Sequence, residues 1–181
     1  TMPYGNIDIC TNGGIYIHLD SEKSVAIGGR SNEGSSYIRV RCKELVIEQM
    51  GKKTLSIGSL LSGADIQIDG TRFSIEHHSK TALGIGSFSD PCNISIRNGC
   101  AKFEMSGDKV GGIGSFNSSG GSIKMADVRI TTEFKAKEIL GIGADKNFGE
   151  IVMNDCTFDS LIEGAESVAL GSADCEGTLS M

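Results

Sequence analysis

The sequence contains very little proline and no tryptophan: its 181 residues include Pro 2, Trp 0 and 6% aromatic residues. A disordered chain would carry more proline and a larger excess of one charge, so this composition predicts a folded protein. With 39% apolar residues the chain is long enough to bury one core, and we expect a single domain over residues 1–181.

Other features that are missing exclude some partners. The sequence has no cluster of Lys and Arg and its net charge is -6, so nucleic acid is not an expected partner. No stretch approaches the roughly 20 continuous apolar residues that a membrane span needs. The first residues lack the charged and apolar regions of a signal peptide, so any export signal would lie outside this sequence.

Glycine, by contrast, is abundant, with Gly 25, and much of it recurs in one short motif. An apolar residue followed by glycine returns at intervals of 28 to 30 residues. We call this apolar residue the spine residue of each repeat. A constant period in this range is typical of a repeat architecture. The spine residues are Ile27, Ile57, Ile85, Ile113, Ile142 and Leu170.

A single repeat indicates which elements to expect. After Ile57 the chain passes a polar corner, alternates apolar and polar residues over 65–69, and turns at Gly70. It alternates again over 72–76 and crosses 77–81 to the next spine motif. This pattern predicts three short strands per repeat. Because each strand is too short to bury its apolar face alone, the repeats must stack on one another.

The other repeats support a solenoid. The two longest carry their extra residues in the same corner, at 29–36 and 115–121. We therefore predict an all-β fold, a right-handed parallel β-helix (β-solenoid) of about six coils, with the hand taken from the general rule for parallel crossovers. A β-propeller would need about 40 residues per blade, and the 3.6-residue period of helical repeats is not found. The spine glycines are expected to let neighbouring coils approach closely.

The repeated Ile-Gly motif, the x-Ile-x-Ile strands and the turn Asn154-Asp155-Cys156-Thr157-Phe158 carry a family resemblance. They resemble the parallel β-helix repeats of bacterial secreted and surface proteins described as carbohydrate-binding, which are distantly similar to the pectate-lyase-like superfamily. The resemblance covers nearly the whole chain. It implies a polysaccharide ligand and an extracellular or cell-surface location, by family analogy. One difference is that this chain is poorer in Gly and Thr and carries Cys 6.

Neither end of the repeat array has a polar capping repeat. Residues 178–181 fall on an apolar strand position, so the array would end on an open edge. This pattern predicts either a domain excised from a longer protein or end-to-end self-association through the uncapped coils.

Four cysteines fall near one turn of the coils. Neighbouring coils lie about 4.8 Å apart, so Cys10 and Cys42, one coil apart, could form a disulfide, whereas Cys100 and Cys156 are two coils apart and could not. The alternative is that the thiols are free and fill the turn. No cysteine spacing matches a zinc site.

A glutamate recurs at the same outward position of four successive coils, where we expect a spacing of about 4.8 Å. Arg72, Lys102 and Arg129 project from the same sheet, so a solvated, self-neutralising face is one interpretation. A calcium or sugar-hydroxyl site is another, and a catalytic pair at glycosidase spacing is a third. The glutamates are Glu48, Glu76, Glu104 and Glu133.

A second candidate column lies three residues after the spine residue, at Leu60, Phe88 and Phe116, flanked by Arg30 and Asp145. If exposed, these side chains would suit stacking on sugar rings or a partner surface. Alternatively, they fold back and close the corner over the core.

Three functions remain open. Regular repeats without a distinctive catalytic insertion favour a noncatalytic binding or adhesion module, with polysaccharide as the expected ligand. A polysaccharide lyase or glycoside hydrolase using the outward glutamates is the second, although short corners leave little wall for a deep groove. A structural spacer or assembly domain is the third. No cofactor is expected apart from calcium at the glutamates.

Overall fold

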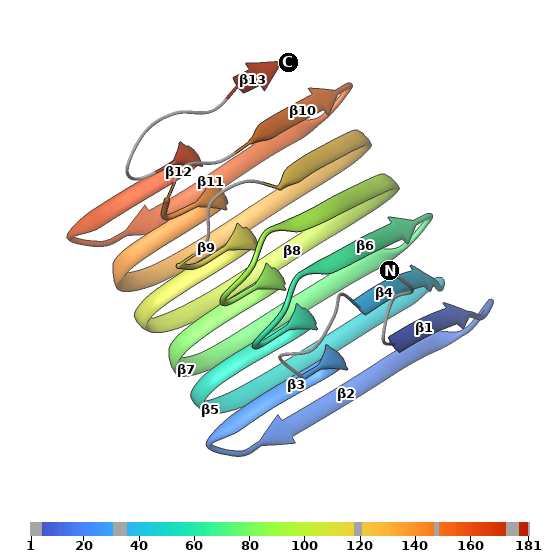
Figure 1. Cartoon of the computed structure of the whole chain (residues 1–181), viewed down its shortest axis with the longest axis horizontal. Coiled ribbons are helices and arrows are strands. Elements are labelled where there is room, and N and C mark those ends of the chain that lie inside the picture. Colours follow the sequence, from blue (N-terminus) through green and yellow to red (C-terminus); the bar gives the residue numbers. More distant parts are fainter. Residues whose placement is uncertain (1–4, 31–35, 118–120, 147–148, 173–177, 181) are drawn as a thin grey trace.

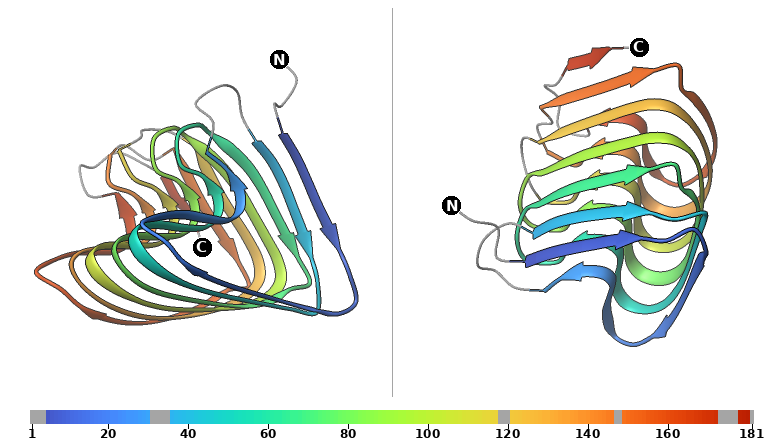
Figure 2. Two further views of the ribbon diagram at one scale, coloured as in Figure 1. Left: turned by 90° about the horizontal axis from the view of Figure 1, so that it is seen from below. Right: turned by 90° about the vertical axis from the view of Figure 1, so that its right-hand side faces the viewer.

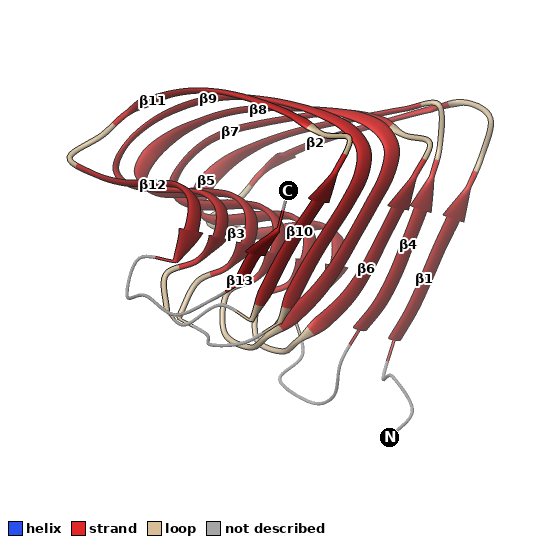
Figure 3. Ribbon diagram, turned by 90° about the horizontal axis from the view of Figure 1, so that it is seen from above, coloured by secondary structure: helices blue, strands red, loops and turns tan. Residues whose placement is uncertain are grey.

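The structure is a computed structural model and describes residues 5–30, 36–117, 121–146, 149–172 and 178–180. These residues form β-strands that pair in parallel with their neighbours and contain no helix, hence none that could span a membrane (Figure 3). The strands stack as a β-solenoid of about six turns, which confirms the predicted parallel β-helix (Figure 1).

Each coil has a three-sided outline and contributes a strand to three faces of the solenoid (Figure 2). Four long strands pass from one face to another: β5 (Glu44–Ser59), β7 (Arg72–Ser87), β8 (Cys92–Ser115) and β9 (Ser122–Ala144). The first face consists of β1 (Gly5–Cys10), β4 (Ser36–Arg41), β6 (Ala64–Asp69), the beginnings of β8 and β9, β10 (Glu150–Asn154) and β13 (Thr178–Ser180). The second consists of β2 (Gly14–Asp20), the first halves of β5 and β7, the middle of β8 and β9, and β11 (Thr157–Glu163). The third consists of β3 (Lys23–Gly29), the ends of the four long strands, and β12 (Glu166–Ser172).

The prediction of three short strands per coil is wrong for the central coils. Residues 77–81, expected as a crossing, belong to β7, and β8 runs through all three faces. Strand pairing persists around the bend because each coil has a neighbour on both sides that satisfies its backbone N–H and C=O groups. The alternation of apolar residues therefore located the faces but not the strand ends.

The spine residues form one continuous column, as predicted. Ile57 pairs in register with Ile27 and Ile85, and the column continues through Ile113 and Ile142 to Leu170. The glycine after each spine residue has a positive φ, for example 141° at Gly86. A Cβ atom at Gly86 would lie 1.7 Å from the carbonyl oxygen of Gly114 in the next coil. Glycine is therefore required here both by conformation and by the approach of the coils.

The turn between the first and second faces explains the Asn-Asp-Cys-Thr-Phe motif. Gly70, Asn98, Asp127 and Asp155 occupy this turn in successive coils, with φ between 51° and 62°. Asn and Asp tolerate the left-handed region better than other residues with a side chain. The motif is thus explained as a turn signal.

Most inward side chains of the solenoid are apolar, but a chain of buried polar groups lies near its N-terminal end. The buried ring of His77 contacts the hydroxyls of Thr54 and Ser56, each at 2.6 Å. Ser56 donates to Gln49, and Gln49 in turn donates to Ser24. Since the Ser56 proton is used for Gln49, Ser56 accepts from Nε2–H of His77, and Thr54 donates to Nδ1. The network therefore holds a neutral imidazole, and burial, with a smaller contribution from the charge of His78, lowers its pKa to about 3.

The corner column is buried, which decides between its two interpretations. Leu60, Phe88 and Phe116 are at most 3% exposed and pack on Leu55 and Leu83 of the third face. The rings of Phe88 and Phe116 meet edge to face at 5.4 Å. These side chains are therefore not exposed for stacking on sugar rings, because they close a second apolar cluster over the outer side of the spine strands.

Cys10 and Cys42 are both free thiols. Cys10 pairs in register with Arg41, so the side chain of Cys42 lies on the opposite side of the strand from that of Cys10. Cys42 is buried and Cys10 is exposed. The bridge considered from the sequence is not formed. Cys42 is a buried free thiol, as the alternative predicts, whereas Cys10 is free but exposed.

Candidate functional site

The outward side chains of the second face form straight columns across the coils, and we call this surface the glutamate face. In its central column Glu48, Glu76, Glu104 and Glu133 are in register, as the sequence predicts. His18 precedes them and Leu161 follows. Parallel pairing sets the spacing of adjacent carboxylate-bearing residues at about 4.8 Å.

Three of these glutamates have a side-chain nitrogen within hydrogen-bond distance on the same face. Glu48 lies 3.1 Å from Nδ1 of His18, and Glu76 lies 2.9 Å from Nε2 of His78. Glu104 accepts from Lys102 at 3.0 Å, and that hydrogen bond and charge raise the pKa of Lys102. The carboxylate side chains remain about half exposed, so each pair is weak and its members are free to exchange partners with a ligand.

Beside this column lies a shallow hollow of about 300 Å³ that spans four coils, from Glu44 to Arg129. Its rim carries the exposed cationic residues Arg72, Lys102 and Arg129, and Phe73 and Ala101 of the core contribute to its floor. Arg72 and Arg129 make no ion pair with any other described residue. An ion pair between these arginines and the glutamate column is therefore not observed, and both arginines line the hollow.

Hydroxyl and carboxylate groups complete the rim of this hollow. Ser74 and Thr131 flank Lys102 in the adjacent coils. Glu44 stands at one end and accepts a hydrogen bond of 2.7 Å from the exposed Tyr16. Donors and acceptors thus lie beside one another around an open, shallow hollow. Such an arrangement can hydrogen-bond several hydroxyl groups of one extended ligand at once.

The described residues include no group of three or more His, Cys, Asp or Glu side chains arranged to hold a metal ion. The four glutamates lie in a straight row, each on its own strand, and do not converge on one point.

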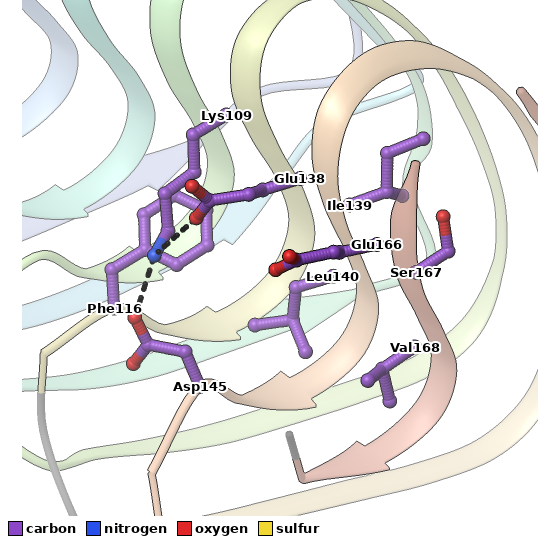
Figure 4. Close-up of a pocket in the computed structure, with 9 residues that line it drawn as sticks. All are labelled: Lys109, Phe116, Glu138, Ile139, Leu140, Asp145, Glu166, Ser167 and Val168. Atoms are coloured by element: carbon purple, nitrogen blue, oxygen red, sulfur yellow. Dashed lines mark hydrogen bonds and ion pairs between the residues drawn. The ribbon is translucent and has the colours of Figure 1, made fainter. Parts of the chain in front are cut away.

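A second hollow, not predicted from the sequence, lies on the third face near the C-terminal end (Figure 4). Its mouth carries Lys109, Glu138, Asp145 and Glu166, and its walls include Leu140, Val168 and Phe116. The available signal was Asp145 itself, a carboxylate at the position that holds Leu60, Phe88 and Phe116 in the preceding coils. A different side chain at one position of a repeating column indicates that the surface of that coil differs from the surface of its neighbours.

Comparison of the chain with protein-family models, with curated proteins and with solved structures gives no match.

Proposed function

We propose that this protein is a noncatalytic binding module that recognises polysaccharide through its glutamate face, outside the cell or at the cell surface. The observation that supports the proposal is the in-register row of half-exposed glutamates beside the hollow rimmed by Arg72 and Arg129. An extended chain of sugars can lie along the row and repeat similar contacts from coil to coil. The repeat of one coil is comparable to the length of one sugar ring.

Electrostatics and shape both favour binding over catalysis. Glu76 and Glu104 are each paired with a base, His78 and Lys102, and both stand on an open surface. Catalysis by a carboxylate pair requires a site that orients the substrate and excludes water. A flat face with many weak polar contacts suits recognition of a long ligand, where affinity is the sum of many small terms.

The proposal is tested with a glycan array that compares the wild-type protein with the double variant Arg72→Gln/Arg129→Gln. Because both arginines are exposed, we expect the variant to fold and to lose at least about tenfold in binding, corresponding to removal of two hydrogen-bonded cations. The matched control is Lys124→Gln, which removes an exposed cation from the first face. If the wild type binds a glycan and the double variant binds it equally well, the glutamate face is not the ligand surface.

A glycosidase or lyase remains the second candidate, because Glu76 and Glu104 are direct neighbours in register, near the roughly 5 Å separation of a retaining pair. Incubation with the glycans that bind, followed by a reducing-end and unsaturated-product assay, tests it. We expect no product. Product that disappears in both Glu76→Gln and Glu104→Gln would replace the binding proposal by this one.

A further inference from the structure

The second hollow exists because one side chain of the corner column is replaced. In successive coils the backbone N–H three residues after the spine residue donates to the preceding coil: Phe88 to Ser59, Phe116 to Ser87 and Asp145 to Ser115. The backbone geometry therefore continues unchanged to Asp145, and only the side chain differs. Phe88 and Phe116 place aromatic rings over the outer side of the third face, whereas Asp145 places a carboxylate at the same position of its coil.

The carboxylate of Asp145 is held away from the apolar wall. It accepts a hydrogen bond of 2.8 Å from Nζ of Lys109 and one of 2.6 Å from the backbone N–H of Asn117. This leaves a hollow of about 90 Å³ against Leu140 and Val168. Since an apolar cavity of about 150 Å³ binds benzene, this smaller hollow suits a chain of a few methylene groups better than a large ring.

The mouth of the hollow is acidic. Lys109, Glu138 and Glu166 occupy one column of adjacent strands, in that order. Lys109 pairs with Glu138 at 3.2 Å as well as with Asp145. Figure 4 shows the carboxylates of Glu138 and Glu166 extending in the same direction, toward the side where Lys109 and Asp145 lie. Glu166 makes no ion pair with the other residues that the structure describes, so one negative charge at the mouth is not compensated there.

The side chain of Lys109 shows which kind of group an aromatic ring and two carboxylates accommodate beside this hollow. Its ammonium group lies 4.9 Å from the ring centre of Phe116 while two carboxylates hold its charge. Burial opposes the charged form, yet the hydrogen bonds and charges of Asp145 and Glu138 outweigh it and raise the pKa of Lys109. One coil further along, Glu138 and Glu166 repeat the acidic part of this arrangement without a cation between them.

We propose that this hollow is a binding site for an alkylammonium group, whose aliphatic stem lies on Leu140 and Val168 and whose charged end lies between Glu166 and Glu138. A lysine side chain of a partner protein and a free aliphatic amine share this chemistry. The site is on the third face, so it is separate from the glutamate face and does not depend on the proposed function.

The test is an NMR titration of methyl-labelled protein that follows Leu140 and Val168. The probes are n-butylamine at neutral pH, an N-acetylated peptide with a single lysine, and n-butanol as a neutral ligand of similar shape. We expect saturable shifts with the amine, the peptide or both, and little response to butanol. Shifts with the amine alone identify a small-molecule site, and tighter binding of the peptide identifies a protein partner.

Variants show whether charge directs the binding. Glu166→Gln is exposed and should fold, and it should weaken amine binding about threefold, the effect of one exposed ion pair. Glu163→Gln, an exposed glutamate of the second face that pairs with Lys135, is the matched control and should bind as the wild type does. Equal shifts with butanol and butylamine, an unchanged affinity in Glu166→Gln, or no saturable shift with any probe would each overturn the proposal.

Discussion

The buried imidazole of His77 should make the stability of the protein fall as the pH is lowered below about 6.5. The pKa of this group falls from an ordinary value of 6.5 to about 3 in the folded protein, because the ring is buried. Between these two values the unfolded chain binds a proton that the folded chain does not. Stability is therefore full above about pH 6.5 and falls as the pH is lowered toward 3.

The size of the effect follows from linkage. Each pH unit within this window costs about 1.4 kcal/mol, so lowering the pH from about 7 to about 4.5 should remove roughly 2 to 3 kcal/mol of stability through His77 alone. The folded protein does not readily protonate His77 at these pH values, because Thr54 would have to stop donating a hydrogen bond to Nδ1 and accept one instead.

The variant to compare is Thr54→Ala/His77→Met, which copies the next coil. Ala82 is in register with Thr54, and Met105 is in register with His77, so the replaced pair is one this fold already accommodates. Ser56 keeps its bond to Gln49. His18→Gln, which removes an exposed histidine, is the control.

Because the chain has Trp 0, urea unfolding is followed by circular dichroism at several pH values. We expect the wild type and His18→Gln to lose roughly 2 to 3 kcal/mol more than the double variant between about pH 7 and about pH 4.5. Parallel pH profiles for the wild type and the double variant would refute a neutral, buried His77 as the cause.

Three further predictions concern the backbone, the corner and the thiols. Gly86→Ala should prevent folding, because its Cβ would lie 1.7 Å from a carbonyl oxygen, and the loss of the β-sheet signal in circular dichroism would show this. Gly70→Ala is the control: it has open space around it and should lower the stability by only about 1 to 2 kcal/mol, because of its left-handed φ. A fold that accepts both equally would contradict the coil spacing. Phe116→Ala should lower stability by about 3 kcal/mol in urea unfolding and leave glycan binding of the folded protein unchanged; the reverse pattern would restore this ring as a binding residue. The exposed Cys100 should react with a thiol reagent in the native protein, while Cys92, whose pKa is raised to about 12 by burial, should react only on unfolding, and mass spectrometry of labelled peptides distinguishes the two.

The sequence was informative wherever the repeat itself imposes a constraint. The spine glycines and the glutamate column were placed correctly because one period sets the register of every coil, and a shift of one residue would bury the glutamates. The corner column was left open between core and surface, since spacing alone does not say whether Phe88 folds back over Leu83. Packing between neighbouring coils decides that question.

Features that break the repeat were harder to predict. His77 occupies an inward position that is Met in the next coil, and only the hydroxyls of Thr54 and Ser56 on another strand make it acceptable there. Asp145 creates the second hollow by replacing an aromatic residue. This consequence is recognised only in the structure, where Leu140 and Val168 line the same hollow. Both depend on contacts between segments more than 20 residues apart, and these contacts follow from the three-dimensional stacking.

The most direct test of polysaccharide recognition by the glutamate face is a backbone amide NMR titration with the glycan that gives the strongest array signal. Saturable shifts should concentrate at outward residues of the second face, at Ser74, Glu76, Lys102 and Glu104. Shifts confined to the first face, around Gln67 and Lys124, or the absence of a saturable response to any array glycan, would contradict the proposed function.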